Sequence, residues 1–229
     1  MVCRRPVSPL RRSQYKRQPV LISILAAVLT TNVVACPQES EDVAQAARLV
    51  EHLRHRKMKF DPDGHVWYLD LSEQDAVSDG TLAAVRHLPY LREVYLIYCP
   101  IKGDGLAHLS VLNRIEKLDL YATYIDDKAL EHVAKLPTLK YLDIRSVGVN
   151  DKGFTKSVHG FISDDGIKLV SDTLPNLESL LCSGTVTDDG LRHLVKLKKL
   201  RYVEIGSPNV SSDGIKWLQN AMPNLEIDW

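Results

Sequence analysis

Residues 177–191 read LESLLCSGTVTDDGL, and this stretch decides the fold of the 229-residue chain. Its first half alternates apolar and polar positions, as a short strand does when one face meets a core and the other meets solvent. Its second half places hydroxyl and carboxylate side chains just before Leu191, where they can accept hydrogen bonds from the free N–H groups of a helix's first turn. The stretch therefore predicts one strand, one turn and one helix.

This unit recurs along the chain. Similar strand segments stand at 68–71, 93–96, 117–120, 141–144, 179–182 and 202–205, and the steps counted from Leu69 are 25, 24, 24, 38 and 23 residues. A further apolar residue stands three positions before each central one and completes an L-x-x-L-x-L pattern, at Val66, Leu91, Ile115, Leu139, Leu177 and Leu200. One unit cannot bury its own apolar stripe, so stability requires the units to stack in parallel around a shared core.

The L-x-x-L-x-L pattern resembles the leucine-rich repeat. The second half of the unit is similar to the bacterial relatives of the cysteine-containing class, which read roughly T-x-V-T-D-x-G-L-x-x-L. Residues 185–191 match that half closely, and further matches with small departures stand at 77–79, 125–127, 162–164 and 210–214. The resemblance covers about residues 57 to 229. It implies an α/β fold, a leucine-rich-repeat solenoid with a curved parallel β-sheet on the concave side and helices on the convex side.

The segments between the strands predict helices with one apolar stripe turned inward, as at Leu106, Leu109 and Leu112. Proline follows several of these helices because it cannot continue the hydrogen-bond pattern, at Pro89, Pro137, Pro175 and Pro223. We divide the chain into a signal peptide (1–35), an N-terminal capping helix and turn (36–64), and a repeat domain of about six to seven repeats (65–229). The DPDG sequence at 61–64 is the turn, and residues 225–229 predict a final abbreviated strand.

The long step of 38 residues predicts an insert near 147–162. It contains two near-copies of one turn, at 149–154 and 162–167. We take the second as the true helix start, because Ile167, Val170 and Leu174 follow it at helical spacing. The first is then an inserted loop that holds Phe154 and Phe161. Two interpretations stay open: a functional loop on a rigid scaffold, and a drifted insertion whose aromatic side chains pack against the neighbouring helix.

The N-terminal 35 residues have the three parts of an export signal. Six basic residues precede an apolar run from Val20 to about Val34, no acid occurs before Glu39, and Ala35 offers a cleavage point. The run is too short to span a bilayer comfortably. Residues 33–36, VVAC, resemble a bacterial lipobox in which Cys36 becomes the lipidated first residue. Cleavage at an ordinary signal-peptidase site and an uncleaved anchor helix stay open as alternatives. Without the leader, 23 basic residues face 29 acidic ones, which disfavours nucleic acid as a partner.

Cysteine usage agrees with a fold that needs no disulfides. Cys3 and Cys36 belong to the leader, which leaves Cys99 and Cys182. The repeat period puts these about three units apart, roughly 14 Å at about 4.8 Å per strand, whereas a disulfide tolerates at most about 7 Å between Cα atoms. We expect both thiols to be unpaired, with Cys182 in the core. The resemblance to leucine-rich repeats implies that Cys99 stands at a position that bonds neighbouring loops.

The residues between the inward leucines face the concave side in three columns. The first is Tyr68, Glu93, Lys117, Tyr141, Ser179 and Tyr202; the second is Asp70, Tyr95, Asp119, Asp143, Leu181 and Glu204; the third is Ser72, Ile97, Tyr121, Arg145, Ser183 and Gly206. Tyrosine offers a large contact area, a hydrogen-bonding tip and little rotamer entropy to lose, so this composition suits binding. The five acids favour a basic or amine-bearing patch on the partner.

We therefore expect these columns to bind a protein or peptide ligand, and the chain to act as a monomer. The candidate binding residues are Tyr68, Asp70, Glu93, Tyr95, Lys117, Asp119, Tyr121, Tyr141, Asp143, Arg145, Tyr202 and Glu204. The competing interpretation is structural, because the repeat prefers aspartate between its leucines and tyrosine is a good strand former.

Metal binding and catalysis find little support in the sequence. His108, His132 and His193 share one repeat position but lack a third ligand close by, and paired aspartates such as Asp126 and Asp127 stand where helix caps are needed. We find no phosphate loop or dinucleotide fingerprint. We expect a non-enzymatic module without metal or cofactor, placed in the cell envelope or outside the cell. The alternative is a substrate-recognition subunit similar to the F-box leucine-rich-repeat adaptors of ubiquitin ligases, which would need a helical docking domain in place of an export signal.

Overall fold

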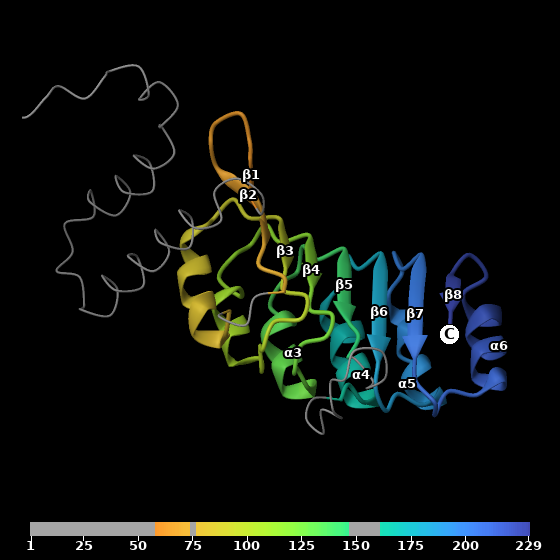
Figure 1. Cartoon of the computed structure of the whole chain (residues 1–229). Helices are drawn as coiled ribbons and strands as arrows, with labels where there is room; N and C mark the ends of the chain where they lie inside the picture. The colour runs from red at the N-terminus through yellow and green to blue at the C-terminus, as the bar shows by residue number, and fades with distance from the viewer. Residues whose placement is uncertain (1–57, 74–76, 147–160) are drawn as a thin grey trace, which may run out of the picture.

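The computed structural model describes residues 58–73, 77–146 and 161–229, which are the coloured parts of Figure 1. The expected signal peptide, Cys36, the N-terminal capping helix and the first copy of the insert's turn, with Phe154, lie outside the described residues. Among those described, no helix is both long enough and apolar enough to cross a bilayer.

The strands form one sheet in which spatial order follows chain order. They are β1 (Met58–Phe60), β2 (Val66–Asp70), β3 (Glu93–Tyr95), β4 (Lys117–Asp119), β5 (Tyr141–Ile144), β6 (Ser179–Ser183), β7 (Tyr202–Gly206) and β8 (Glu226–Asp228). The first two pair in an antiparallel hairpin across the DPDG turn, and every later neighbour is parallel. We call each parallel strand with the helix that follows it a rung. Figure 1 shows the rungs side by side from β2 to β8.

The register confirms the expected stacking. Leu118 pairs with Val94 on one side and with Leu142 on the other, and the central apolar residues of all six expected segments lie in one row. Every member of that row is fully buried: Leu69, Val94, Leu118, Leu142, Leu180 and Val203. Together with the inward side chains of the helices they form one continuous core, as the period predicted.

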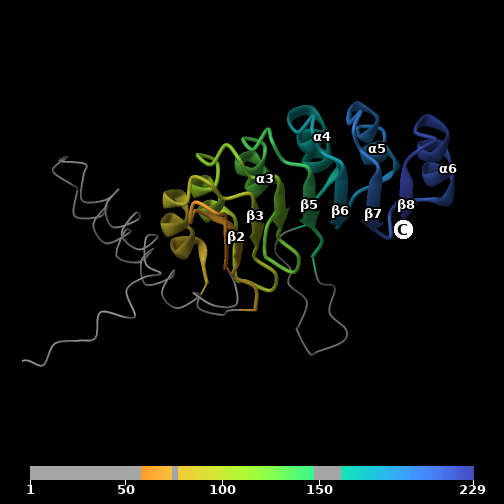
Figure 2. The same ribbon diagram turned by 90° about the horizontal axis from the view of Figure 1, so that it is seen from above.

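The helices form the second layer, opposite the sheet, as Figure 2 shows. They are η2 (Asp79–His87), η3 (Asp104–His108), α3 (Asp127–Val133), α4 (Asp164–Thr173), α5 (Asp188–Leu191), η4 (Leu194–Lys196) and α6 (Ser212–Ala221). The N-terminal ones are 3-10 helices, which the sequence did not predict. Leu106, Leu109 and Leu112 stand three apart, and a helix of three residues per turn puts them on one face. The hydrogen bonds follow this spacing: Leu109 N donates to the Leu106 carbonyl, and Leu112 N donates to the Leu109 carbonyl.

The helix starts carry a contact that runs from one rung to the next. Asp164, at the start of α4, accepts hydrogen bonds from Thr187 N at 2.7 Å and Thr187 Oγ1 at 2.6 Å in the next rung. The same pair of bonds joins Asp127 to Ser163 and Asp188 to Ser211. The N-cap hydroxyl in turn accepts from its own helix, as expected. Asp127, Asp164 and Asp188 thus bond to the neighbouring rung, whereas Asp126 caps its own helix α3 by accepting from Ala129 N, as expected. We call this the inter-rung contact.

Gly190 is required by the inter-rung contact. A Cβ at this position would lie 2.2 Å from Asp164 Oδ1, which is closer than any real contact. Gly166 and Gly214 likewise make room for the carboxylates of Asp127 and Asp188 in the preceding rung. In the last rung Ser212 occupies the place of the linking aspartate.

The two cysteines of the repeats behave as expected. Neither Cys99 nor Cys182 is part of a disulfide, and both are buried. Cys99 donates through Sγ to the Leu71 carbonyl of the preceding rung at 3.1 Å, which bonds neighbouring loops. Burial raises the pKa of the Cys182 thiol to about 12, so it stays protonated at neutral pH.

The second half of the insert also follows the prediction. Helix α4 begins after its N-cap Ser163, and Ile167, Val170 and Leu174 are buried against the core. Phe161 is 47% exposed. The drifted-insertion interpretation placed the aromatic side chains against the neighbouring helix; Phe161 is about half exposed, and Phe154 lies outside the described residues.

Candidate binding face

The parallel register brings the expected columns together on the outer face of the sheet. Tyr68, Glu93, Lys117 and Tyr141 are successive partners, and Asp70, Tyr95, Asp119 and Asp143 are the next row. Backbone bonds from Tyr98 N to Tyr121 O and from Ala122 N to Arg145 O continue the pairing past the strand ends. All twelve candidate residues thus lie on one face, which we call the concave face; Tyr202 and Glu204 lie on β7, apart from the others.

The tyrosines of this face contact one another and the nearby cations. The rings of Tyr68 and Tyr95 lie 5.2 Å apart. Lys117 Nζ lies 5.2 Å from the ring centre of Tyr95 and 4.2 Å from that of Tyr141. The Arg145 guanidinium lies 4.9 Å from the ring of Tyr121. Four strands therefore share a continuous surface of tyrosine rings with cations held against their faces.

An ion network, which we call the brace, joins β5 to β7. Arg145 donates to the Asp143 carboxylate from Nε and from Nη2, the latter at 2.6 Å, and it donates from Nη1 to Glu204 Oε1 at 2.6 Å. The side chain of Asp143 is only 1% exposed. Its hydrogen bonds raise the pKa of Arg145 above the ordinary range, with Glu204 adding to the effect. Three of the twelve candidates are therefore bound to each other, and their charges are satisfied inside the chain.

The aspartates between the inward leucines share a structural contact. One carboxylate oxygen accepts a hydrogen bond from the amide two residues further on: Asp70 from Ser72, Asp119 from Tyr121 and Asp143 from Arg145. This bond closes the turn at the end of each strand. It gives a physical reason for the preference for aspartate at this repeat position, so the recurrence of the residue alone does not indicate binding.

Asp119 differs from the other two in its second oxygen. The residue is 7% exposed, and beyond the bond from Tyr121 N at 3.1 Å it has no hydrogen bond or ion pair among the described residues. Burial raises its pKa to about 6, the Asp143 carboxylate on the next strand adds to this, and Lys117 and Arg145 oppose it. The concave face therefore holds one buried carboxylate whose hydrogen-bonding capacity is half used.

Glu93 and its neighbour Tyr95 form a further internal pair. The Tyr95 hydroxyl donates to Glu93 Oε2 at 3.1 Å. Burial raises the pKa of Tyr95, and the Glu93 carboxylate adds to it. Burial likewise raises the pKa of Tyr141 to about 12. These phenols stay neutral at physiological pH and serve as hydrogen-bonding and packing groups rather than as charges.

Tyr98 belongs to the same surface, and sequence reasoning missed it. It follows β3, is 39% exposed and packs edge-on against Tyr121 with ring centres 5.5 Å apart. Its φ is 58°, a left-handed conformation that costs an ordinary residue about 1–2 kcal/mol. Glu73 and Ala122 stand at the same repeat position with the same conformation. The repeat period of about 24 residues could have predicted that these three positions share a conformation. Their residue types, which differ, could not.

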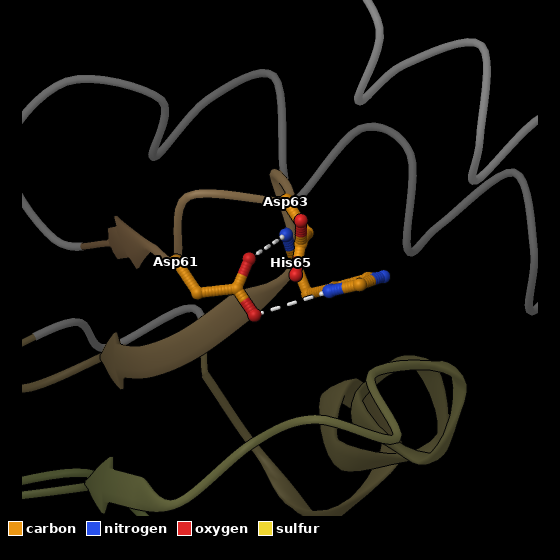
Figure 3. Close-up of side chains that lie close together, drawn as sticks. All are labelled: Asp61, Asp63 and His65. Atoms are coloured by element: carbon orange, nitrogen blue, oxygen red, sulfur yellow. Dashed lines mark hydrogen bonds and ion pairs between the residues drawn. The ribbon is translucent and has the colours of Figure 1, made fainter.

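A second polar cluster lies in the β1–β2 hairpin, shown in Figure 3. Asp61, Asp63 and His65 offer ligand atoms within 4.8 Å of one another, and within the described ranges they are the group of three with metal-ligand chemistry. Both Asp61 oxygens are already used, since they accept from His65 N at 2.8 Å and contact His65 Nδ1 at 3.1 Å. The His65 ring also stacks on Tyr90. The arrangement closes the turn predicted from the DPDG sequence.

Comparisons with known proteins show the fold. No family model and no curated protein matches the chain. Among solved structures it is similar to the leucine-rich-repeat ectodomain of the Arabidopsis receptor kinase HAESA in complex with a peptide hormone, with a TM-score of 0.51 at 18% identity over 82% of this chain and 30% of that one. It is also similar to internalin C2 of Listeria monocytogenes, with a TM-score of 0.48 at 20% identity over 69% of this chain and 68% of that one.

A second Listeria internalin has a TM-score of 0.49 at 17% identity, over 63% of this chain and 36% of that one. The chain thus spans about a third of the length of this internalin and of the HAESA ectodomain. The likeness to the ectodomain agrees with the eight-stranded sheet and its helical layer. The chain has the leucine-rich-repeat solenoid fold that its period predicted.

Proposed function

We propose that this protein is a non-enzymatic binding module that holds a protein or peptide on its concave face. The observation that carries the proposal is the continuous tyrosine surface over β2 to β5, formed by Tyr68, Tyr95, Tyr121 and Tyr141 beside buried and half-buried acids. Such rings bury large areas on binding at little entropic cost. A basic group on the partner complements the acids.

Two further observations support a binding role. A protein of the same fold, the HAESA ectodomain, was solved with a peptide hormone bound. The thiols of Cys99 and Cys182 are buried, and the raised pKa of Cys182 keeps it from acting as a nucleophile at neutral pH. The concave face instead offers rings, hydroxyls and carboxylates, which suit recognition.

The proposal includes export of the chain, in keeping with the resemblance to bacterial cysteine-containing repeats. We propose that residues 1–35 direct it to the cell envelope or beyond, with Cys36 as the lipidated first residue. Intact-mass measurement after expression in bacteria tests this. A mature chain that begins at Cys36 and carries the mass of a diacylglycerol group supports anchoring, whereas an unmodified N-terminus or a retained leader contradicts it.

Selection of peptides tests the binding function. A library of displayed random heptapeptides is selected on the immobilised full chain, and the enriched peptides are measured by fluorescence polarisation. We expect the double variant Tyr95→Ser, Tyr121→Ser to weaken their binding at least tenfold. Tyr124→Ser is the matched control, because Tyr124 is an exposed tyrosine outside the three columns. Equal binding to the double variant, or no enrichment on the wild type, contradicts the proposed function.

A further inference from the structure

We propose that Asp119 is the anchor of the concave face, where its carboxylate receives one lysine or arginine side chain of the bound protein or peptide. The inference rests on the proposed function and adds to it the chemistry and the position of the main contact. It follows from four observations: how the other acids are occupied, how Asp119 is buried, where the nearby cations are held, and which rings surround the site.

The other described acids of the central strands are occupied within the chain. The Asp143 carboxylate accepts from Arg145 N, Nε and Nη2, so both of its oxygens are bonded. Glu204 accepts from Arg145 Nη1, and Glu93 accepts from the Tyr95 hydroxyl. Asp119 has the same structural bond to the amide two residues on, but its second oxygen has no partner among the described residues. Among the described buried acids of β3 to β7, Asp119 is thus the one whose carboxylate has an oxygen free to accept another hydrogen bond.

Its burial makes the missing partner costly. A carboxylate that is 7% exposed has lost most of its hydration, and the Asp143 carboxylate lies on the neighbouring strand in direct register. A poorly hydrated carboxylate gains more from a charged hydrogen-bond donor than an exposed one does, so a cation from a ligand is a favourable partner for it. The pKa of about 6 reflects the same cost and leaves the group ionised at neutral pH, ready for a cation.

The nearby cations are held away from Asp119. Arg145 is committed to Asp143 and Glu204. Lys117, two residues before Asp119 on the same strand, places Nζ between the rings of Tyr95 and Tyr141 and forms no ion pair with Asp119. Among the described residues Asp119 therefore has no direct ion pair, although Lys117 and Arg145 lie on the same face and lower its pKa through space.

The surrounding rings define what kind of group fits. Tyr95 pairs directly with Asp119, Tyr121 lies just past the end of β4, and Tyr141 lies diagonally on β5. The contacts of Lys117 and Arg145 with these tyrosines show that both an ammonium and a guanidinium pack against them, at 4.2 to 5.2 Å. A partner's lysine or arginine would reach the carboxylate with its aliphatic stem against tyrosine rings and its charge on the open oxygen.

The test compares peptides that differ only at one basic residue. The best N-acetylated heptapeptide from the selection above is synthesised with its central residue as lysine, arginine or norleucine, and each is titrated against the full chain by fluorescence polarisation. We expect norleucine to weaken binding to the wild type at least tenfold. On Asp119→Asn the three peptides should bind within about twofold of one another. Glu226→Gln is the control, since Glu226 is an exposed acid at the far end of the same face.

A second measurement needs no variant. Carbon-13 NMR of the Asp119 carboxyl in the wild type follows its titration, and the lysine peptide should lower its pKa from about 6 while the norleucine peptide leaves it in place. Asparagine keeps the acceptor for Tyr121 N, so Asp119→Asn should fold, and a thermal melt checks this.

The outcomes separate the two proposals. If selected peptides bind but norleucine costs nothing, or if the preference for lysine survives in Asp119→Asn, the anchor is wrong while concave-face binding stands. If the lysine peptide binds without moving the Asp119 titration, the anchor is equally wrong. If no peptide binds the wild type, the proposed function falls and the anchor falls with it.

Discussion

The helix starts and the concave face of this solenoid differ in how far their side chains repeat. At the helix starts, the same contact from a carboxylate to a hydroxyl recurs at Asp127, Asp164 and Asp188. Each of these carboxylates lies against a glycine of the next rung. On the concave face, the first column changes from rung to rung through Tyr68, Glu93, Lys117, Tyr141 and Ser179. Repetition marks the contacts that hold rungs together, whereas variation marks positions that the stacking leaves free for recognition.

The brace is the exception on the concave face, and it carries the largest predicted effect. Replacing Arg145 by methionine leaves the nearly fully buried Asp143 carboxylate without its cation. Breaking a buried pair in this way costs about 3–5 kcal/mol, so we expect a loss of that order in the free energy of unfolding from urea denaturation.

The double variant Arg145→Met, Asp143→Asn is the control for the brace, because it removes both charges and should recover part of the loss. A single variant as stable as the wild type would show that Asp143 does not depend on Arg145. In that case the brace would belong with the variable positions of the face rather than with the repeated contacts.

The inter-rung contact gives the next effect. Asp164→Ala removes the acceptor of two hydrogen bonds from Thr187, each made to a charged group. We expect the free energy of unfolding to fall by about 2–3 kcal/mol in urea denaturation. Asp165→Ala is the matched control, since the neighbouring exposed residue makes no such contact and should cost at most about 1 kcal/mol through the helix dipole. Equal losses in the two variants would remove the distinction between the linking aspartate and an ordinary first-turn acid.

The same contrast explains what the sequence could predict. The alternation and the period of about 24 residues determine the register, because one residue of slip would turn every leucine such as Leu118 to solvent. The pattern therefore placed all twelve candidate positions on one face of the sheet, as the structure has them. The repeated aspartates were also correctly assigned to helix starts, although their partners lie one rung further on, as Asp164 shows.

Contacts that depend on side-chain reach could not be predicted in this way. Arg145 meets Glu204 from 59 residues away by spanning β6, where the intervening second-column residue is the apolar Leu181. Both Asp119 and Asp143 are aspartates at the same repeat position, so the residue type cannot show that Asp143 has both oxygens hydrogen-bonded and Asp119 only one. The periodic pattern predicts the backbone position of each residue. Whether its side chain stays open to a ligand depends on which hydrogen bonds the neighbouring side chains form.

The pH dependence of stability tests that difference between the two aspartates. Because the pKa of Asp119 is raised to about 6 in the folded chain, the folded state binds this proton more tightly than the unfolded state. The resulting stabilisation is complete below about pH 3.8 and is lost as the pH rises through about 6. The titratable groups that face Asp119 are Tyr95, Lys117, Tyr121, Tyr141, Asp143 and Arg145. The two cations among them lower the pKa of Asp119, and the value of about 6 is what remains after their effect.

We therefore expect Asp119→Asn to match the wild type near pH 3.5 and to exceed it by about 1–2 kcal/mol at pH 7.5, below the limit of about 3 kcal/mol that the full change in pKa would give. Urea denaturation of both proteins across this range measures the difference. Parallel stability curves would show that burial of this carboxylate costs the fold nothing, and the argument for a missing partner would lose its energetic basis.

The smallest effect is expected at Tyr98, where strain and recognition meet. Asparagine adopts the left-handed conformation more readily than tyrosine, so Tyr98→Asn relieves about 1 kcal/mol or more of backbone strain while it loses the edge-on contact with Tyr121, worth about 0.5–1.5 kcal/mol. We expect a net gain of about 0.5 kcal/mol, seen as a rise of about 1–2 °C in Tm, together with weaker binding of the selected peptides. Tyr124→Asn is the control, because Tyr124 is as exposed but has no positive φ, and it should not be stabilised. If Tyr98→Asn raises stability and weakens binding, recognition is the reason for the strained tyrosine. If Tyr98→Asn and Tyr124→Asn change stability and binding alike, Tyr98 belongs to neither the repeated contacts nor the recognition surface.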